Sequence, residues 1–65
     1  MQKSVLRRAS VISRTGLSRS SIYLKMAQGQ FPQSIRLGQR AVGWLESDVD
    51  AWITGRIEEA RRPEA

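Results

Sequence analysis

Apolar residues in the first half of the chain recur at the spacing of helices. Val11 and Ile12 predict the inward side of a short helix over residues 8–15. Ile22 and Met26 lie one helical turn apart and predict the buried stripe of a second helix. The pattern therefore indicates two short helices that follow each other closely in the sequence.

The segment between these two helices has the residues of a tight turn. Gly16 ends the first helix, because glycine readily adopts the left-handed conformation found at helix C-termini. Ser18 is a good N-cap for the second helix, since its hydroxyl can accept a free backbone N–H of that helix, and Gly29 ends it. We expect a helix-turn-helix in which Leu17 fills the angle between the two helices.

The middle of the chain changes to a period of two, which is typical of strands that are covered on one face. Ile35 and Leu37 alternate with polar residues, and Val42 and Trp44 alternate with small ones. Residues 38–40 lie between the two runs and form a short turn that contains glycine. The pattern predicts a β-hairpin that packs on the helices, because a two-stranded hairpin is not stable by itself.

A third helix is predicted for the last part of the sequence. Ser47 is the expected N-cap, and Asp50, three residues later, can complete a capping box. The apolar stripe of this helix consists of Val49, Trp52 and Ile53. We expect the helix to run to about Glu59 and to be followed by a frayed tail over residues 61–65.

Together these elements predict an α+β fold that is mainly α: a small winged helix-turn-helix of three helices and a two-stranded β-hairpin wing. A short leading strand over residues 3–6 is a further option. We expect a single domain over residues 1–60, because a chain of 65 residues is shorter than most single domains. The rings of Phe31, Trp44 and Trp52 are expected in the core rather than stacked on nucleic-acid bases.

Composition argues against several classes of function. The chain has no cysteine and no histidine, which excludes disulfides, the usual structural zinc sites and Ser-His or Cys-His nucleophile pairs. We therefore expect neither an enzyme nor a bound metal or cofactor. The sequence also lacks the ~20 apolar residues of a membrane span and the apolar centre of a signal peptide, so we expect a cytoplasmic protein with no membrane partner.

The net charge of +5 and the isoelectric point of about 11.2 indicate an anionic partner, for which nucleic acid is the leading candidate. In a helix-turn-helix the start of the second helix reaches the DNA bases. The candidate contacts on this helix are Ser18, Arg19, Ser20, Ser21, Tyr23 and Lys25. Arg19 can form two hydrogen bonds to one guanine. Leu24 is left open between contact with a thymine methyl and a single exposed leucine.

The hairpin supplies two further candidates for DNA contact, Arg36 and Arg40. Arg40 lies at or beside the turn, where an arginine can enter a narrow minor groove or bind phosphates. Three more arginines in or near the first helix, Arg7, Arg8 and Arg14, are left open between nonspecific phosphate contacts and an ordinary charged surface.

Four segments of the sequence together resemble the AlpA family of prophage regulatory proteins. They are TGLSRSSIY at residues 15–23, GQFP at 29–32, LGQRAVGW at 37–44 and ESDVDAW at 46–52. The resemblance extends over residues 5–57 and implies a small DNA-binding regulator of transcription, related to phage excisionases and to MerR-type winged helices. It also implies that the recognition helix starts with Ser18, Arg19, Ser20 and Tyr23. The wing residue that it implies is Arg40.

The expected function is sequence-specific binding of double-stranded DNA by a phage- or prophage-type transcriptional regulator, with homo-oligomers on repeated DNA sites as an option. Two alternatives stay open. One is an excisionase-like architectural factor that bends DNA, and the other is a basic module that binds an acidic protein partner through the third helix. The sequence has no leucine-zipper-like heptads, so a dimer would not form through a coiled coil.

Overall fold

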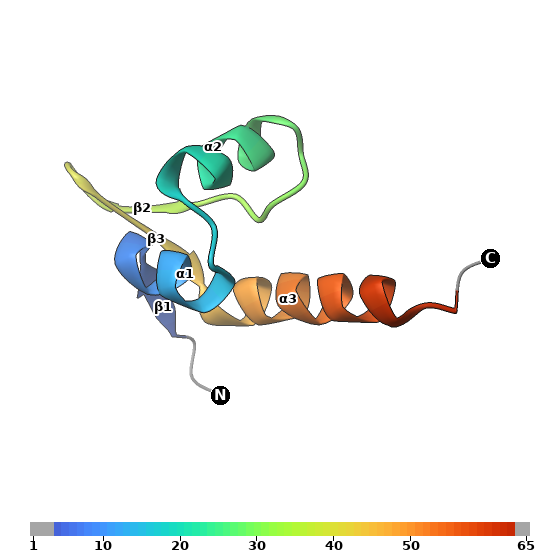
Figure 1. Ribbon diagram of the computed structural model, residues 1–65. Helices are drawn as coiled ribbons and strands as arrows, with labels where there is room; N and C mark the ends of the chain where they lie inside the picture. Colours follow the sequence, from blue (N-terminus) through green and yellow to red (C-terminus); the bar gives the residue numbers. More distant parts are fainter. Residues whose placement is uncertain (1–3, 64–65) are drawn as a thin grey trace.

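A computed structural model describes residues 4–63 as three helices and a small antiparallel sheet (Figure 1). The elements follow in the order β1 (Val5–Arg7), α1 (Arg8–Thr15), α2 (Arg19–Ala27), β2 (Ile35–Gly38), β3 (Ala41–Leu45) and α3 (Glu46–Arg61). The predicted α+β fold of winged helix-turn-helix type is confirmed. Lys3, at the start of the optional first strand, and Glu64 and Ala65, in the expected tail, lie outside the described residues.

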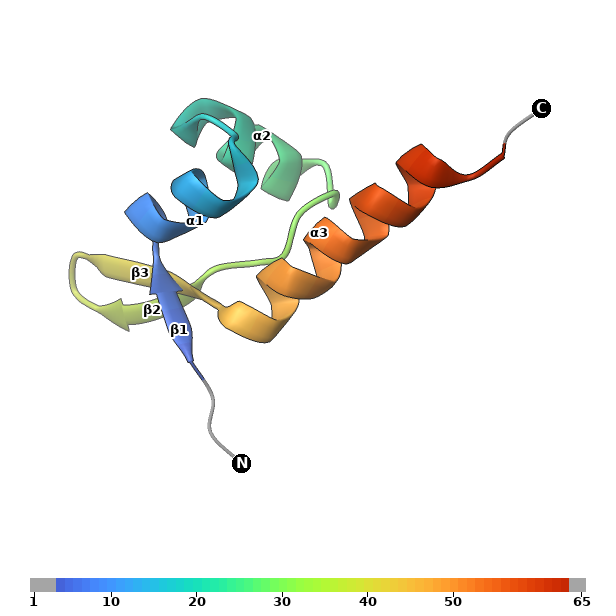
Figure 2. The ribbon, with the colours of Figure 1, turned by 60° about the horizontal axis from the view of Figure 1, so that its bottom comes forward.

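The sheet has three strands in the order β1-β3-β2, and both neighbouring pairs are antiparallel. The optional leading strand therefore exists, and it extends the expected two-stranded wing to a three-stranded sheet. Leu6 pairs with Trp44, and the chain passes directly from Arg7 into α1. This pairing holds the start of α1 next to β3 (Figure 2).

The expectation that both strands of the hairpin bury their apolar residues against the helices is wrong for β2. Ile35 and Leu37 are 37% and 45% exposed. Ile35 pairs with Gly43, and Arg36 pairs with Val42, which packs against the core. Because directly paired residues share a face of the sheet, Arg36 lies on the side of the helices and Ile35 lies on the outer side.

The turn between α1 and α2 has the residues and the roles that the sequence predicts. Gly16 is left-handed, with φ of 75°, and its N–H donates to the carbonyl of Ile12 at 2.8 Å. The Thr15 hydroxyl donates to the carbonyl of Val11 at 2.8 Å and accepts the N–H of Leu17 at 3.2 Å. Leu17 packs against the core from within the turn. These bonds fix the angle at which α2 leaves α1.

The end of α2 is also closed by a glycine, as predicted. Gly29 has φ of 72°, and its N–H donates to the carbonyl of Met26 at 3.1 Å. The N–H of Gln30 donates to the carbonyl of Lys25 at 2.7 Å. This pair of bonds is a Schellman motif, which satisfies the free carbonyls at a helix end.

The predicted start of the third helix is wrong. α3 begins at Glu46 with Leu45 as its N-cap, and no side-chain hydrogen bond caps it, so the expected capping box of Ser47 and Asp50 is absent. Pairing of the sheet continues up to the helix boundary, where the backbone N–H of Glu46 donates to the carbonyl of Ser4 at 2.8 Å. The strand therefore passes into the helix with no loop in which a serine cap could act.

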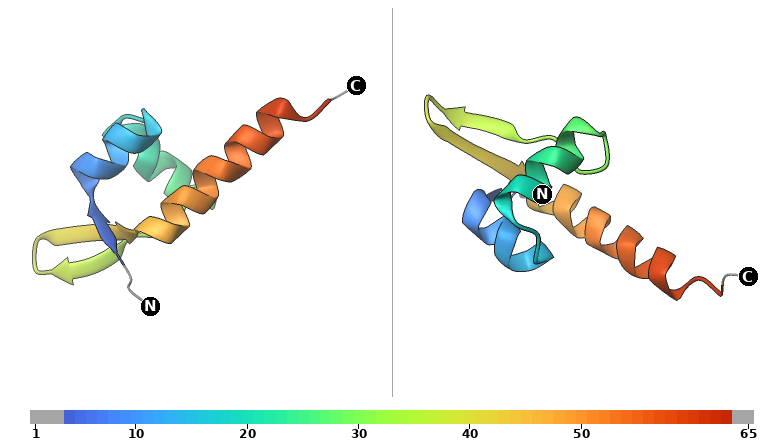
Figure 3. Two further views of the ribbon diagram at one scale, coloured as in Figure 1. Left: turned by 90° about the horizontal axis from the view of Figure 1, so that it is seen from below. Right: turned by 45° about the horizontal axis from the view of Figure 1, so that its top comes forward.

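α3 is the longest helix and runs for 16 residues to Arg61, past the expected end near Glu59. It extends away from the sheet, so that its C-terminal end lies at the opposite end of the molecule from the hairpin turn (Figure 3). Within residues 4–63, no helix combines the length and the apolar character needed to cross a lipid bilayer.

The core combines side chains from the helix-turn-helix, the following loop, β3 and α3. It consists of Val11, Ile22, Phe31, Trp44 and Val49. Trp44 is fully buried, and its Nε1 donates to the carbonyl of Pro32 at 3.0 Å. Trp52 is half-buried at the edge of the core, where its Nε1 donates to the carbonyl of Gln30 at 2.9 Å and its ring meets Phe31 edge-on. The core positions predicted for the three large rings are therefore confirmed, with Trp52 at the margin.

Gly43 leaves space that its neighbours in the sheet occupy. A Cβ atom at Gly43 would lie 2.5 Å from Val5 Cγ1 and 2.9 Å from the carbonyl oxygen of Leu6. We expect Gly43→Ala to lower the free energy of unfolding by about 1–2 kcal/mol, because the backbone of β1 must shift to admit the new methyl group. Urea unfolding followed by circular dichroism measures this loss.

Gly55→Ala is the matched control for the Gly43 substitution. Among residues 4–63, no atom beyond the adjacent backbone of α3 lies within 4 Å of a Cβ atom at Gly55, which is inside this helix. Alanine favours a helix interior over glycine by about 1 kcal/mol, so this variant should be more stable than the wild type. A Gly43→Ala variant as stable as the wild type would contradict the close packing of β1 against β3.

Candidate nucleic-acid interface

Hydrogen bonds between Ser18 and Ser21 cap the start of α2, and the two residues between them are exposed. Ser18 is the N-cap, as predicted: its Oγ accepts the N–H of Ser21 at 3.1 Å, and its hydroxyl donates to the Ser21 Oγ at 3.0 Å. Arg19 and Ser20 are the first two residues of the helix, and both are exposed. The start of the helix therefore presents a guanidinium and a hydroxyl to solvent.

Tyr23 links Arg19 to the core. The Cζ atom of Arg19 lies 6.0 Å from the centroid of the Tyr23 ring, at the outer limit of a cation–π contact. The Tyr23 ring meets the buried Trp44 ring edge-on, with 6.3 Å between the centroids. Tyr23 is 36% exposed, so it belongs both to the surface and to the packing around the core. Through this stack, a side chain of the core supports an exposed arginine.

The later positions of α2 differ in their exposure. Ile22 is fully buried, whereas Leu24 is 60% exposed. Lys25 is half-buried. The outward position predicted for Leu24 is thus confirmed, and its contact with a thymine methyl stays a hypothesis.

The hairpin places Arg40 at its tip. Gln39 and Arg40 form the turn between β2 and β3, and both are exposed. Arg36 is exposed on β2. The hairpin turn and the start of α2 lie toward the same end of the molecule, opposite the end of α3 (Figure 1). The start of α2 and the hairpin turn, which carries Arg40, therefore belong to one end of the fold.

Arg14 has a different position from the other candidate arginines. Its guanidinium pairs with the carboxylates of Glu46 at 3.0 Å and Asp50 at 3.5 Å, and all three side chains are partly exposed. These pairs connect α1 to the first turns of α3. Of the two readings left open by the sequence, the structure favours a charged surface contact within the protein for Arg14.

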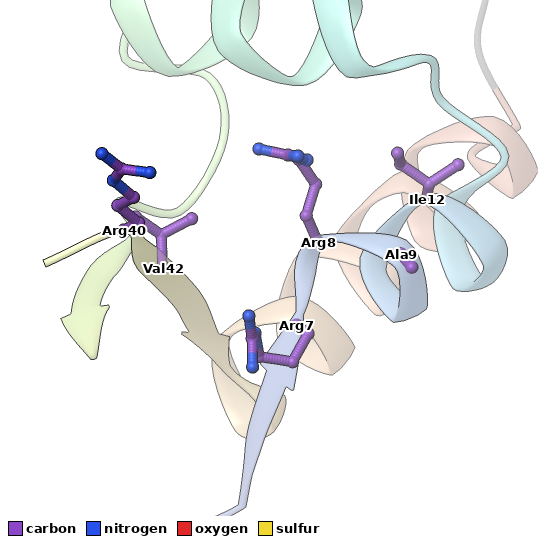
Figure 4. A pocket seen from close by; sticks show the side chains of 6 residues that line it. All are labelled: Arg7, Arg8, Ala9, Ile12, Arg40 and Val42. Atoms are coloured by element: carbon purple, nitrogen blue, oxygen red, sulfur yellow. The ribbon is translucent and has the colours of Figure 1, made fainter. Parts of the chain in front are cut away.

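Arg7 and Arg8, which the sequence left open between phosphate contacts and an ordinary charged surface, lie with Arg40 around one hollow. They come from the end of β1 and the start of α1, and the hollow separates them from the hairpin turn (Figure 4). The distribution of charged residues along the sequence indicates a basic surface in the first part of the chain. Residues 1–45 contain eight Lys and Arg residues and no Asp or Glu. Residues 46–65 contain three Lys and Arg residues and six Asp and Glu residues.

Comparison with known proteins identifies relatives across most of the chain. Residues 4–57 match the family model described as Prophage CP4-57 regulatory protein (AlpA). The chain is 44% identical to the uncharacterized protein ORF88 of Enterobacteria phage P4 in an alignment of 61 positions that covers 94% of this chain and 69% of that protein. It is 34% identical to the DNA-binding transcriptional activator AlpA of Escherichia coli K12 in an alignment of 60 positions that covers 83% of this chain and 86% of the relative.

Proposed function

We propose that this chain, which belongs to the AlpA family of prophage regulatory proteins, is a transcriptional regulator that recognises a specific sequence in double-stranded DNA. The similar protein from Escherichia coli is named as a DNA-binding transcriptional activator. The observation that carries the proposal is the exposed start of α2, where the Arg19 guanidinium lies over the Tyr23 ring, which in turn meets the Trp44 ring edge-on. A supported side chain loses less conformational freedom when it binds, which favours recognition.

In this proposal α2 enters the major groove with its N-terminal end first. Side chains at the start of a recognition helix reach base edges most directly. Arg19 would read a guanine through its two parallel N–H groups, and Ser20 would bond a base or a phosphate. Ser18, Ser21, Tyr23 and Lys25 would surround this contact and bond the sugar-phosphate backbone. The chemistry requires no cofactor.

The hairpin would act as a wing on the same DNA. Arg36 and Arg40 are both exposed, and Arg40 is at the tip, where it can reach phosphates or the adjacent minor groove. One module of this size buries about 600–1,000 Å² of protein surface on DNA. Useful specificity therefore favours several copies of the chain on repeated sites. Localisation in the cytoplasm follows from the DNA target and belongs to the same proposal.

The charge of α3 counts against the alternative of a module that binds an acidic protein through this helix. α3 contains five carboxylates and two arginines, which give it a net charge of −3. An acidic partner would be repelled by this surface. DNA bending of the excisionase type uses the same interface as the proposal, so a bending assay on phased duplexes beside a transcription reporter separates the two.

Selection of bound duplexes from a random DNA pool tests the proposed function. We expect one short motif to be enriched, because a mismatch at a base pair that the protein reads costs about 1–3 kcal/mol. Circular dichroism of the same sample verifies that the protein is folded. A folded protein that enriches no motif would contradict sequence-specific recognition.

A further inference from the structure

A hollow of about 310 Å³ lies between the start of α1 and the hairpin turn, and three arginines line it. Arg7, Arg8 and Arg40 supply its charged groups, and the remaining lining residues are Ala9, Ile12 and Val42. The guanidinium groups of Arg8 and Arg40 extend toward the same side of this hollow (Figure 4). Arg7 is opposite Gly43 on β3, and Arg8 follows it at the start of α1, so the pairing of β1 with β3 places this segment beside the strand that leaves the hairpin turn.

The positive charge of this hollow has no counterpart in the part of the chain that the structure describes. Among residues 4–63, none of the ion pairs involves Arg7, Arg8 or Arg40. The first turn of α1 contains no acidic residue. Glu46 and Asp50 are the carboxylates of α3 that reach α1, and both pair with Arg14 at its other end. Three arginines thus line one hollow with no carboxylate paired to them among the described residues, an arrangement that an external anion would stabilise.

We propose that this hollow binds a phosphate group, and that the phosphate belongs to the DNA backbone. Arginine presents planar pairs of N–H donors that match the oxygens of a phosphate, so side chains from two elements can hold one group from both sides. The inference rests on the proposed function and adds a contact to it. The bound phosphate connects α1 to the hairpin turn, and it thereby fixes the orientation of the whole helix-turn-helix on the duplex.

A double-mutant cycle with Arg8→Gln and Arg40→Gln tests whether the two arginines share one phosphate. Glutamine removes the charge and keeps most of the side-chain stem. We expect each variant to bind a random-sequence duplex more weakly, and the double variant to lose less affinity than the product of the two losses, by about twofold or more, because residues that hold one group do not act independently. The slope of log affinity against log salt should fall by about 0.9 in the double variant, as for one phosphate.

Arg61→Gln is the matched control, since Arg61 carries the same charge but lies at the end of α3, far from the hairpin turn. It should leave the salt slope unchanged. Thermal melts of all variants verify that they fold. Independent losses at Arg8 and Arg40 would assign them to separate phosphates and overturn the shared site, and so would unchanged affinity in the Arg8 variant.

One measurement distinguishes a free phosphate from a phosphate of the DNA backbone. A second distinguishes failure of this phosphate site from failure of DNA binding as a whole. Inorganic phosphate alone should shift the amide NMR signals of Ala9 and Arg40 only weakly, and duplex DNA should displace it. Inorganic phosphate that stays bound at saturating duplex would assign the hollow to a free phosphate and overturn the backbone contact. If the wild type binds no duplex at low salt, the proposed function fails as well; if it binds but Arg8→Gln has no effect, only this inference fails.

Discussion

Replacement of Trp44 by alanine is expected to unfold most of the protein. The Trp44 side chain is fully buried, its Nε1 donates to the carbonyl of Pro32, and its ring supports Tyr23. Truncation of a buried tryptophan costs about 3–5 kcal/mol. A chain of 65 residues has little stability in reserve, because a small domain buries only about 60% of the surface of its unfolded chain. The thermal melt of Trp44→Ala, followed by circular dichroism, should lose its cooperative transition.

Trp52→Ala is the matched comparison for Trp44→Ala. The Trp52 side chain is half-buried at the edge of the core, so its truncation removes less buried surface and leaves a space that solvent can enter. We expect Trp52→Ala to retain a cooperative melt at a lower temperature. A Trp44→Ala variant with a near-native melt and lost DNA affinity would show that the Trp44 ring is a contact residue rather than a core residue.

The elements that could be predicted from the sequence are those whose determinants lie within a few residues. Gly16 and Gly29 end helices because the glycine itself adopts the left-handed conformation. Ser18 caps α2 because its hydroxyl needs to reach only three residues along the chain. The fold class followed from these local signals together with the two spacings of apolar residues.

The face of β2 could not be predicted, because a period of two indicates which side chains share a face but not which face is covered. Ile35 lies on the outer side since it pairs with Gly43, and that register depends on pairing between two strands. The start of α3 could not be predicted either, because it also depends on pairing between distant segments. Ser47 has a suitable side chain for a cap, but a bond between Ser4 and Glu46, 42 positions apart in the sequence, sets the boundary first.

The candidate interface also has a part that could be predicted from local sequence and a part that could not. The residues at the start of α2 are consecutive, so one helix assignment was enough to predict them as a group. Arg8 and Arg40 are far apart in the sequence, and the pairing of β1 with β3 brings the segments that carry them to one hollow. The absence of any Asp or Glu before Glu46 indicated that the first part of the chain is basic, but it could not indicate which arginines meet.

Arg19→Ala is expected to weaken binding to the specific DNA site by about 1–3 kcal/mol, or roughly 5- to 150-fold, and to relax the preference at one base pair. Arg19 is exposed at the first position of α2, and its guanidinium lies over the Tyr23 ring. A guanine in the major groove offers two acceptors that match the two parallel N–H groups of arginine. Random-sequence affinity should fall much less, since the remaining basic residues still contact the backbone.

Arg19→Lys separates charge from geometry in this prediction. Lysine keeps the positive charge but lacks the planar pair of donors, so it should restore general affinity better than it restores the base preference. The measurement is the profile of bases selected from a random DNA pool by the wild type and by both variants, together with affinities for one selected duplex and one random duplex. If Arg19 bonds only a phosphate, Arg19→Ala will weaken binding evenly across sequences. A selected profile in Arg19→Ala that equals the wild-type profile at every position would therefore contradict base reading by Arg19, and would transfer the specificity of α2 to Ser20 and its neighbours.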